Sequence, residues 1–227
     1  MDYWRNNTIW FDDIPNDLFL QLNLKEEKLK KDILKDIEYL ILWHYKKGKS
    51  GNFVDISESL VFLNLIWSNI QNFDGIERLT KIKRLELDYC VKLENDKGIS
   101  KLADTLEYLH IDNSKKFVPG EEFFSLKNLR VLSLNSCGNL ENLSFLSHFP
   151  KLIDFRFVDT NVIDGDLTPI KEHPTIRSAG FLNKRHYNLS EEKIESHLKE
   201  KNEGMDYKTT IMKRDGSRKY YSFRYNY

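Results

Sequence analysis

The sequence has few cysteines, no excess of charge of either sign and no long apolar run. Its two cysteines, Cys90 and Cys137, are too few for a disulfide framework. Lysine plus arginine and aspartate plus glutamate each number 35, so no overall field attracts nucleic acid or an anionic membrane surface. Because no apolar run reaches the roughly 18 residues that a membrane span requires, no contact with a membrane is expected.

Recognisable catalytic motifs are also missing. The six histidines do not have the spacing of a zinc-binding helix or finger. The sequence contains neither a glycine-rich phosphate loop nor the G-x-S-x-G motif of a nucleophilic serine. We therefore expect no catalytic residues, no metal site and no cofactor, and we predict that the chain is not an enzyme.

The first residues do not have the pattern of a secretory signal. MDYWRNNTIWFDD lacks a basic stretch followed by an apolar one. The expected location is therefore the cytoplasm, and the free protein is expected to be a monomer.

One apolar pattern, apolar-x-x-apolar-x-apolar, recurs along most of the chain. Its spacing is narrow: successive first positions are 23, 22, 24, 23, 23 and 24 residues apart. Those first positions are Ile37, Leu60, Ile82, Leu106, Leu129, Leu152 and, in a degraded copy, Ile176. This period and pattern match the leucine-rich repeat, which places one short strand of a parallel sheet in each copy. Short helix-like returns are predicted between the strands, over residues 73–79, 98–102, 121–126, 143–149 and 167–170.

The ninth position of each central repeat holds a small polar residue: Cys90, Ser114, Cys137 and Thr160. Two interpretations of the cysteines are open, a redox or metal-binding pair and two buried positions that bond the backbone of the adjacent turn. Cys90 and Cys137 lie two repeats apart, which places them about 10 Å apart at one strand spacing per repeat. Because a disulfide needs Cα atoms within about 7 Å, the buried interpretation is favoured.

The segments Leu79–Cys90 and Leu126–Cys137 resemble the short leucine-rich repeats of bacterial proteins and are similar in length to those of internalins. The resemblance covers about residues 37–188. It implies an α/β solenoid with a curved parallel sheet on the concave face and short helices or 3₁₀ turns on the convex face. It implies nothing about the partner, because a fold does not determine a function.

Both ends depart from the repeat and are predicted to be caps, since an uncapped solenoid exposes its apolar core. Residues 1–36 form the predicted N-terminal cap, with a charged amphipathic helix over 24–37. Residues 189–227 form the predicted C-terminal cap, with a helix starting at Ser190 and a β-hairpin around Asp215-Gly216. Basic and aromatic residues interleave in this hairpin. It is interpreted either as a capping hairpin with a basic edge, which we favour, or as a stacking platform for single-stranded nucleic acid.

Side-chain alternation predicts that the third, fifth, seventh and eighth residues of each repeat face the concave side. In the N-terminal half these positions include a nearly contiguous aromatic patch, and an acidic strip adjoins it. The candidate partner-binding residues are Tyr39, Trp43, Phe62, Ile66, Trp67, Glu86, Asp88, Tyr89, Tyr108, Asp112, Asp154 and Asp159. Tyrosine and tryptophan dominate binding hot spots, which favours an open patch. The alternative is that the N-terminal cap folds over the aromatic part through Trp4 or Trp10.

The sequence therefore predicts a non-enzymatic protein-binding module. Small bacterial leucine-rich-repeat proteins with such a groove resemble immunity proteins, which neutralise a cognate toxin, and an acidic strip would suit a basic toxin domain. A scaffold or regulatory subunit for a resident protein is the alternative. Binding of nucleic acid through the hairpin is less expected, because the net charge is zero.

Overall fold

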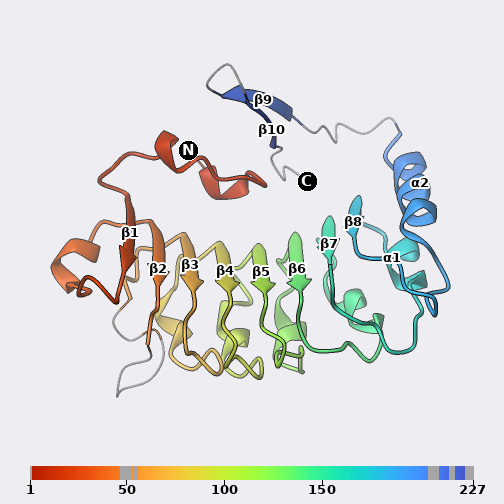
Figure 1. Cartoon of the computed structure of the whole chain (residues 1–227), viewed down its shortest axis with the longest axis horizontal. Helices are drawn as coiled ribbons and strands as arrows, with labels where there is room; N and C mark the ends of the chain where they lie inside the picture. The colour runs from red at the N-terminus through yellow and green to blue at the C-terminus, as the bar shows by residue number, and fades with distance from the viewer. Residues whose placement is uncertain (1, 47–52, 54–55, 204–209, 215–217, 223–227) are drawn as a thin grey trace.

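The computed structural model describes residues 2–46, 53, 56–203, 210–214 and 218–222. Eight parallel strands form one sheet whose spatial order is the order of the chain (Figure 1). They are β1 (Phe19–Asn23), β2 (Tyr39–Trp43), β3 (Phe62–Ile66), β4 (Arg84–Asp88), β5 (Tyr108–Asp112), β6 (Val131–Asn135), β7 (Asp154–Arg156) and β8 (Ser178–Gly180). A parallel sheet that grows by one strand per repeat is a leucine-rich-repeat solenoid, so the predicted fold is confirmed.

The register of the strands stacks the consensus apolar residues into one continuous core. Leu40, Leu63, Leu85, Leu109 and Leu132 are paired from strand to strand, and all are completely buried. Because successive side chains of a strand point to opposite faces, the residues between these leucines project from the other face of the sheet. We call that second face the outer face. It is the face that the sequence assigned to the concave side.

The returns between the strands are short, as predicted. They contain the 3₁₀ turns η4 (Ile76–Arg78), η5 (Ile99–Leu102), η6 (Phe123–Ser125) and η7 (Ser144–His148), and the helix α1 (Thr168–Glu172). Their apolar side chains, such as Ile99, Phe123 and Leu146, are buried in the core. None of the helices in the described ranges is long and apolar enough to cross a bilayer.

The predicted helix over residues 24–37 is wrong. This segment contains only turns and the 3₁₀ turn η3 (Lys31–Leu34), because residues 19–23 before it form a strand. β1 pairs with β2 in a register that matches Phe19 to Tyr39, so the intervening residues must return to the start of β2. A continuous helix over residues 24–37 would leave only Glu38 to connect it to the strands, because β1 ends at Asn23 and β2 begins at Tyr39.

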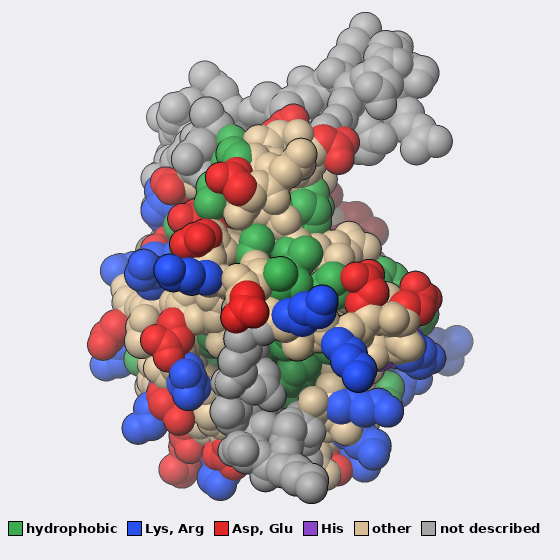
Figure 2. Space-filling model, turned by 90° about the vertical axis from the view of Figure 1, so that its left-hand side faces the viewer, with side chains coloured by type: hydrophobic (Ala, Val, Ile, Leu, Met, Phe, Trp, Pro, Cys, Tyr) green, Lys and Arg blue, Asp and Glu red, His purple; other side chains and the backbone are tan. Residues whose placement is uncertain are grey.

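The described residues before β1 pack on the outer face of the sheet, where Trp4 and Ile14 are buried, and the predicted cap over residues 1–36 remains a prediction. The 3₁₀ turns η1 (Tyr3–Arg5) and η2 (Phe11–Asp13) lie along the upper ends of the strands in Figure 1. Figure 2 views the molecule from the β1 end, where hydrophobic side chains show among charged ones. Leu20, Leu24 and Leu29 are only partly buried against the core there. The charged residues around them discourage pairing of this edge strand with another chain.

At the other end, α2 (Glu191–Lys201) covers the last repeat. Ser190 is its N-cap, and its hydroxyl accepts a hydrogen bond from the Lys193 backbone, as the predicted helix start requires. Ile194 and Leu198 of α2 are buried in the core. The predicted hairpin is also present, because β9 (Thr210–Arg214) pairs antiparallel with β10 (Arg218–Ser222). Residues 204–209, 215–217 and 223–227 lie outside the described residues, so the hairpin's role as a cap remains a prediction.

Candidate binding surface

The N-terminal segment covers the start of the outer face. Trp4 and Ile14 are buried in one apolar cluster with Tyr39, Ile41 and Phe62, which are the third and fifth positions of the first two repeats. Phe62 is completely buried and Tyr39 nearly so. The alternative in which the N-terminal residues fold over the aromatic patch therefore holds for these positions. Tyr39 and Phe62 cannot contact a partner while this segment stays in place.

Arg84, the third position of its repeat, anchors the N-terminal segment. Its guanidinium donates hydrogen bonds to the carbonyl oxygens of Trp4 (3.1 Å), Asn6 (2.5 Å) and Asn7 (3.3 Å). It also bonds the Glu86 carboxylate at 2.6 Å and lies 3.7 Å from the ring centroid of Tyr108. Burial raises the pKa of Tyr108 to about 12, despite the opposing charge of Arg84. The sequence placed Arg84 on this face without indicating its role.

The acidic strip is smaller than the sequence predicted. Glu86 is paired with Arg84, and Asp154 is completely buried beside Arg156, 3.0 Å from its Nε. Asp88, Asp112 and Asp159 remain, and none of the three is paired with lysine or arginine in the described part of the chain. Asp88 lies 3.5 Å from His110, Asp112 accepts a hydrogen bond from Asn113, and Asp159 accepts one from Ser136.

The backbone at the eighth position of the first six repeats, counted from Ile37, is left-handed. His44, Trp67, Tyr89, Asn113, Ser136 and Asp159 have φ between 45° and 59°. Each of the first five donates its backbone N–H to the seventh-position carbonyl of the next repeat, as Trp67 does to Asp88 at 2.9 Å. Asparagine and aspartate tolerate this conformation, whereas a bulky aromatic residue rarely adopts it. Three consecutive repeats nevertheless carry a ring there.

The rings of His44, Trp67 and Tyr89, together with that of Trp43 at the seventh position, form what we call the aromatic cluster. The Trp67 ring lies 5.2 Å from Trp43 in an edge-on contact, 5.0 Å from His44 in a stacked contact and 6.1 Å from Tyr89. Trp67 and Tyr89 are 48% and 46% exposed. Trp43 and Ile66 are half-buried, because they also pack against the cluster beneath the N-terminal segment. The predicted patch is thus divided into a covered part and an open part.

Two histidines set the charge around the aromatic cluster. Partial burial and the positive charges of Lys25 and Lys46 lower the pKa of His44, which favours its neutral form. Burial also opposes the protonation of His110, but its hydrogen bond to Asp88 and the nearby carboxylates outweigh burial and raise its pKa.

Both cysteines occupy buried ladder positions, as the favoured interpretation predicted. The Cys90 thiol donates to the Leu65 carbonyl oxygen at 3.6 Å, and the Cys137 thiol donates to that of Ile111 at 3.5 Å. Thr160 makes the equivalent bond one repeat later, at 2.7 Å to the Leu134 oxygen. Burial raises the pKa of each thiol to about 12. Among the described residues, no group of three or more histidine, cysteine, aspartate or glutamate side chains could hold a metal ion.

No family model and no curated protein matches this chain in sequence. Among solved structures, an internalin (inlF) from Listeria monocytogenes str. 4b F2365 is similar, with 16% identity and a TM-score of 0.45. The similarity covers 69% of this chain and 46% of that one, so this chain spans less than half of the internalin's length. The assignment of the fold therefore rests on the repeat and on the parallel sheet.

Proposed function

We propose that this chain is a non-enzymatic protein-binding module and that the aromatic cluster is the centre of its binding surface. The observation that carries the proposal is the left-handed backbone of Trp67 and Tyr89, each with an exposed ring. Such a backbone costs on the order of 1 kcal/mol or more for a bulky residue, and strain of this kind concentrates at functional sites. Tryptophan and tyrosine are also the residues that contribute most to binding hot spots.

The most specific form of this proposal is an immunity protein that covers a cognate toxin. The aromatic cluster supports it, because such a protein needs a preformed surface with high affinity. Asp88 precedes Tyr89 directly, and Asp112 pairs with Asp88 on the next strand. These two carboxylates, neither of which is paired with lysine or arginine among the described residues, would speed association with a basic toxin domain and disfavour acidic competitors.

A scaffold or regulatory subunit would use the same surface to hold a resident protein. The two functions differ in what happens to the partner, since an immunity protein must abolish the activity of a toxin. Nucleic-acid binding through the hairpin would instead leave the aromatic cluster unused and would weaken steeply with salt.

The test is a comparison of partner capture by three forms of the protein. The double variant W67A/Y89A removes the two exposed rings, and I163A removes an exposed apolar side chain elsewhere on the surface. Each protein is immobilised, exposed to extract of the source cells, and the retained proteins are quantified by mass spectrometry. A captured toxin domain is then assayed with and without each form.

We expect one stoichiometric partner that the wild type and I163A retain and that W67A/Y89A loses by about 100-fold or more. Inhibition of a captured toxin by the wild type and by I163A, but not by W67A/Y89A, would support the immunity function. Retention of a resident enzyme with unchanged activity would favour a scaffold. Equal capture by all three forms would contradict the proposed surface.

A further inference from the structure

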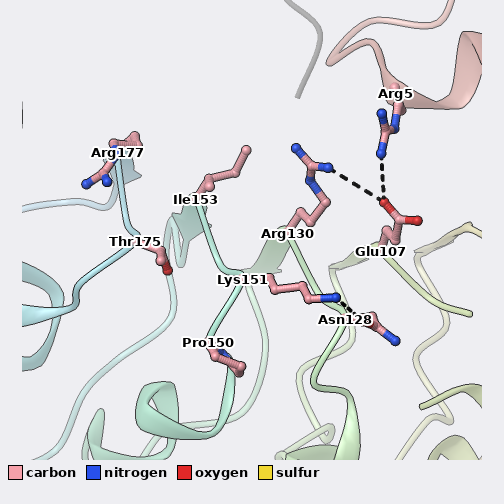
Figure 3. Close-up of a pocket in the computed structure, with 9 residues that line it drawn as sticks. All are labelled: Arg5, Glu107, Asn128, Arg130, Pro150, Lys151, Ile153, Thr175 and Arg177. Atoms are coloured by element: carbon pink, nitrogen blue, oxygen red, sulfur yellow. Dashed lines mark hydrogen bonds and ion pairs between the residues drawn. The ribbon is translucent and has the colours of Figure 1, made fainter. Parts of the chain in front are cut away.

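A cavity of about 470 Å³ opens beside the first residues of strands β6 to β8, at the edge opposite the aromatic cluster. Its lining comes from the segments that lead into consecutive strands and from the N-terminal segment. The lining residues are Arg5, Glu107, Asn128, Arg130, Pro150, Lys151, Ile153, Thr175 and Arg177 (Figure 3). A cavity of this volume lies in the range of small-molecule binding sites.

The charge of this lining is strongly unbalanced. Arg5, Arg130, Lys151 and Arg177 are cations, and Glu107 is the one carboxylate among the lining residues. Glu107 is shared, because it lies 3.4 Å from Arg5, 3.9 Å from Arg130 and 3.3 Å from Lys83, which stands outside the cavity. The whole chain carries no net charge, so this excess is local. Clefts lined by one sign of charge concentrate counter-ions of the other sign.

Arg130 is the least satisfied of these cations. Its side chain is only 11% exposed, and its Nε and Nη2 atoms are buried and make no hydrogen bond to the described residues. Only Nη1 faces Glu107, and its 3.9 Å distance is too long for a hydrogen bond. In Figure 3 another guanidinium nitrogen points away from Glu107, toward the side of Ile153 and Arg177. Burial and the neighbouring charge of Arg5 lower the pKa of Arg130.

The unused nitrogens of Arg130 form the edge of the guanidinium that recognises an oxyanion. Nε and Nη2 carry parallel N–H groups, which match the two oxygens of a carboxylate or a phosphate. A buried charged donor without a partner is costly, and a bidentate anion removes that cost. Nε and Nη2 are covered in this structure, and Glu107 makes no hydrogen bond that holds the guanidinium, so binding of an anion would turn this edge into the cavity.

We propose that this cavity is an anion-binding site in which Arg130 takes a phosphate or carboxylate group in a bidentate contact. Lys151 and Arg177 also line the cavity and supply further positive charge. Lys151 is held by Asn128, whose side-chain oxygen accepts its hydrogen bond at 2.6 Å. Pro150 and Ile153 give the wall an apolar part, so the ligand carries carbon next to its anionic group.

This site is independent of the proposed protein-binding function. Its residues precede the strands, whereas those of the aromatic cluster end them or follow them. One proposal can therefore fail while the other holds. The anion can come from a phosphorylated small molecule or from an acidic side chain, and the two sources are distinguished by the probe that binds better.

The experiment titrates the full chain with inorganic phosphate and, separately, with glutarate, at constant ionic strength. Calorimetry measures affinity, and ¹⁵N NMR follows the Nε–H resonance of Arg130. R130M and R177M remove one cation each and keep the aliphatic stem. R78M is the matched control, because Arg78 is an exposed arginine on a return, paired with Glu58 away from the cavity. The unfolding temperature of every variant is recorded, and R177M keeps the test decisive if R130M fails to fold.

We expect at least one probe to bind with a dissociation constant of about 1 mM or lower. R130M and R177M should each weaken it by about tenfold or more, whereas R78M binds as the wild type does. Stronger binding of phosphate would identify a phosphorylated ligand, and stronger binding of glutarate an acidic side chain. Failure of both probes to bind the wild type, or equal binding by R130M, R177M and wild type, would overturn the proposal.

Discussion

Trp67 and Tyr89 occupy the same position in consecutive repeats, with left-handed backbone at φ of 54° and 55° and ring centroids 6.1 Å apart. The same turn in later repeats carries Asn113 and Ser136, which are common in turns. The solenoid therefore forms this turn without an aromatic residue. Stability of the turn does not explain the rings of Trp67 and Tyr89, whereas the proposed contact with a partner would explain them.

The substitution W67N separates stability from binding. Asparagine relieves backbone strain, whereas the loss of ring contacts with Trp43, His44 and Tyr89 opposes that gain. We expect the free energy of unfolding to change by less than about 1 kcal/mol. Binding of the captured partner should weaken by about 2 kcal/mol or more. Urea denaturation and calorimetry measure the two quantities.

The control for W67N is S136N, at the same turn of a later repeat. It should change neither unfolding nor binding. If W67N unfolds several kcal/mol more easily than wild type, Trp67 has a structural role and the proposed surface loses its main support.

The periodic part of the fold could be predicted because each repeat carries the same signal. Leucines at constant spacing specify the parallel sheet, and small polar residues at the ninth position specify the buried bonds of Cys90 and Cys137. The repeat pattern does not predict β1, because the first consensus position of this strand is Asp17, which is not apolar. The strand, with Leu20 and Leu22 facing the core side, therefore falls within the predicted N-terminal cap.

The candidate surfaces could be predicted only in part, because they depend on contacts that have no periodic signal. Arg84 and the carbonyl of Trp4 are 80 residues apart in sequence, and nothing in either residue's neighbourhood indicates that they meet. The contacts of Arg5 and Arg130 with Glu107 join distant segments in the same way, and the sequence does not indicate them either. Alternation places the seventh-position residues Trp43 and Ile66 on the outer face, but the cover over Phe62 depends on where the N-terminal segment lies.

The substitution R84M should release the N-terminal segment. Methionine keeps the apolar stem but removes the bonds to three carbonyl oxygens and leaves Glu86 without its partner. We expect a loss of about 3 kcal/mol in the free energy of unfolding, typical of a broken buried ion pair. Hydrogen exchange should increase over residues 4–14, and Tyr39 should become more accessible.

R78M provides the comparison for R84M. Arg78 forms an exposed pair with Glu58 at 2.8 Å, and its loss should cost no more than about 0.5 kcal/mol. Equal stability of R84M and R78M would show that Arg84 does not anchor the segment.

Both cysteines should resist alkylation in the folded protein. Their thiols are buried, and a pKa of about 12 leaves roughly one thiolate in ten thousand at pH 8. Iodoacetamide followed by mass spectrometry should show little label on Cys90 or Cys137 in buffer and full label in urea. Fast labelling of Cys90 without denaturant would contradict its buried ladder position.

His110 should make a pH-dependent contribution to the free energy of unfolding, and this contribution should depend on Asp88. Because its folded pKa is raised above the usual value of about 6.5, its charged form stabilises the fold below that pH. This contribution is lost as the pH rises through the folded pKa. In D88N the hydrogen bond to the charged carboxylate is gone and burial lowers the pKa of His110, so NMR titration of its imidazole should show a downward shift.

The difference in unfolding free energy between wild type and D88N should therefore be largest in mildly acidic buffer and shrink as the pH rises above neutrality. The comparison between variants is needed because His173 has the opposite sign. Burial lowers its pKa, and its contribution is lost as the pH falls below about 6.5, in both proteins alike. If the imidazole of His110 titrates at the same pH in both proteins, Asp88 does not stabilise the protonated imidazole.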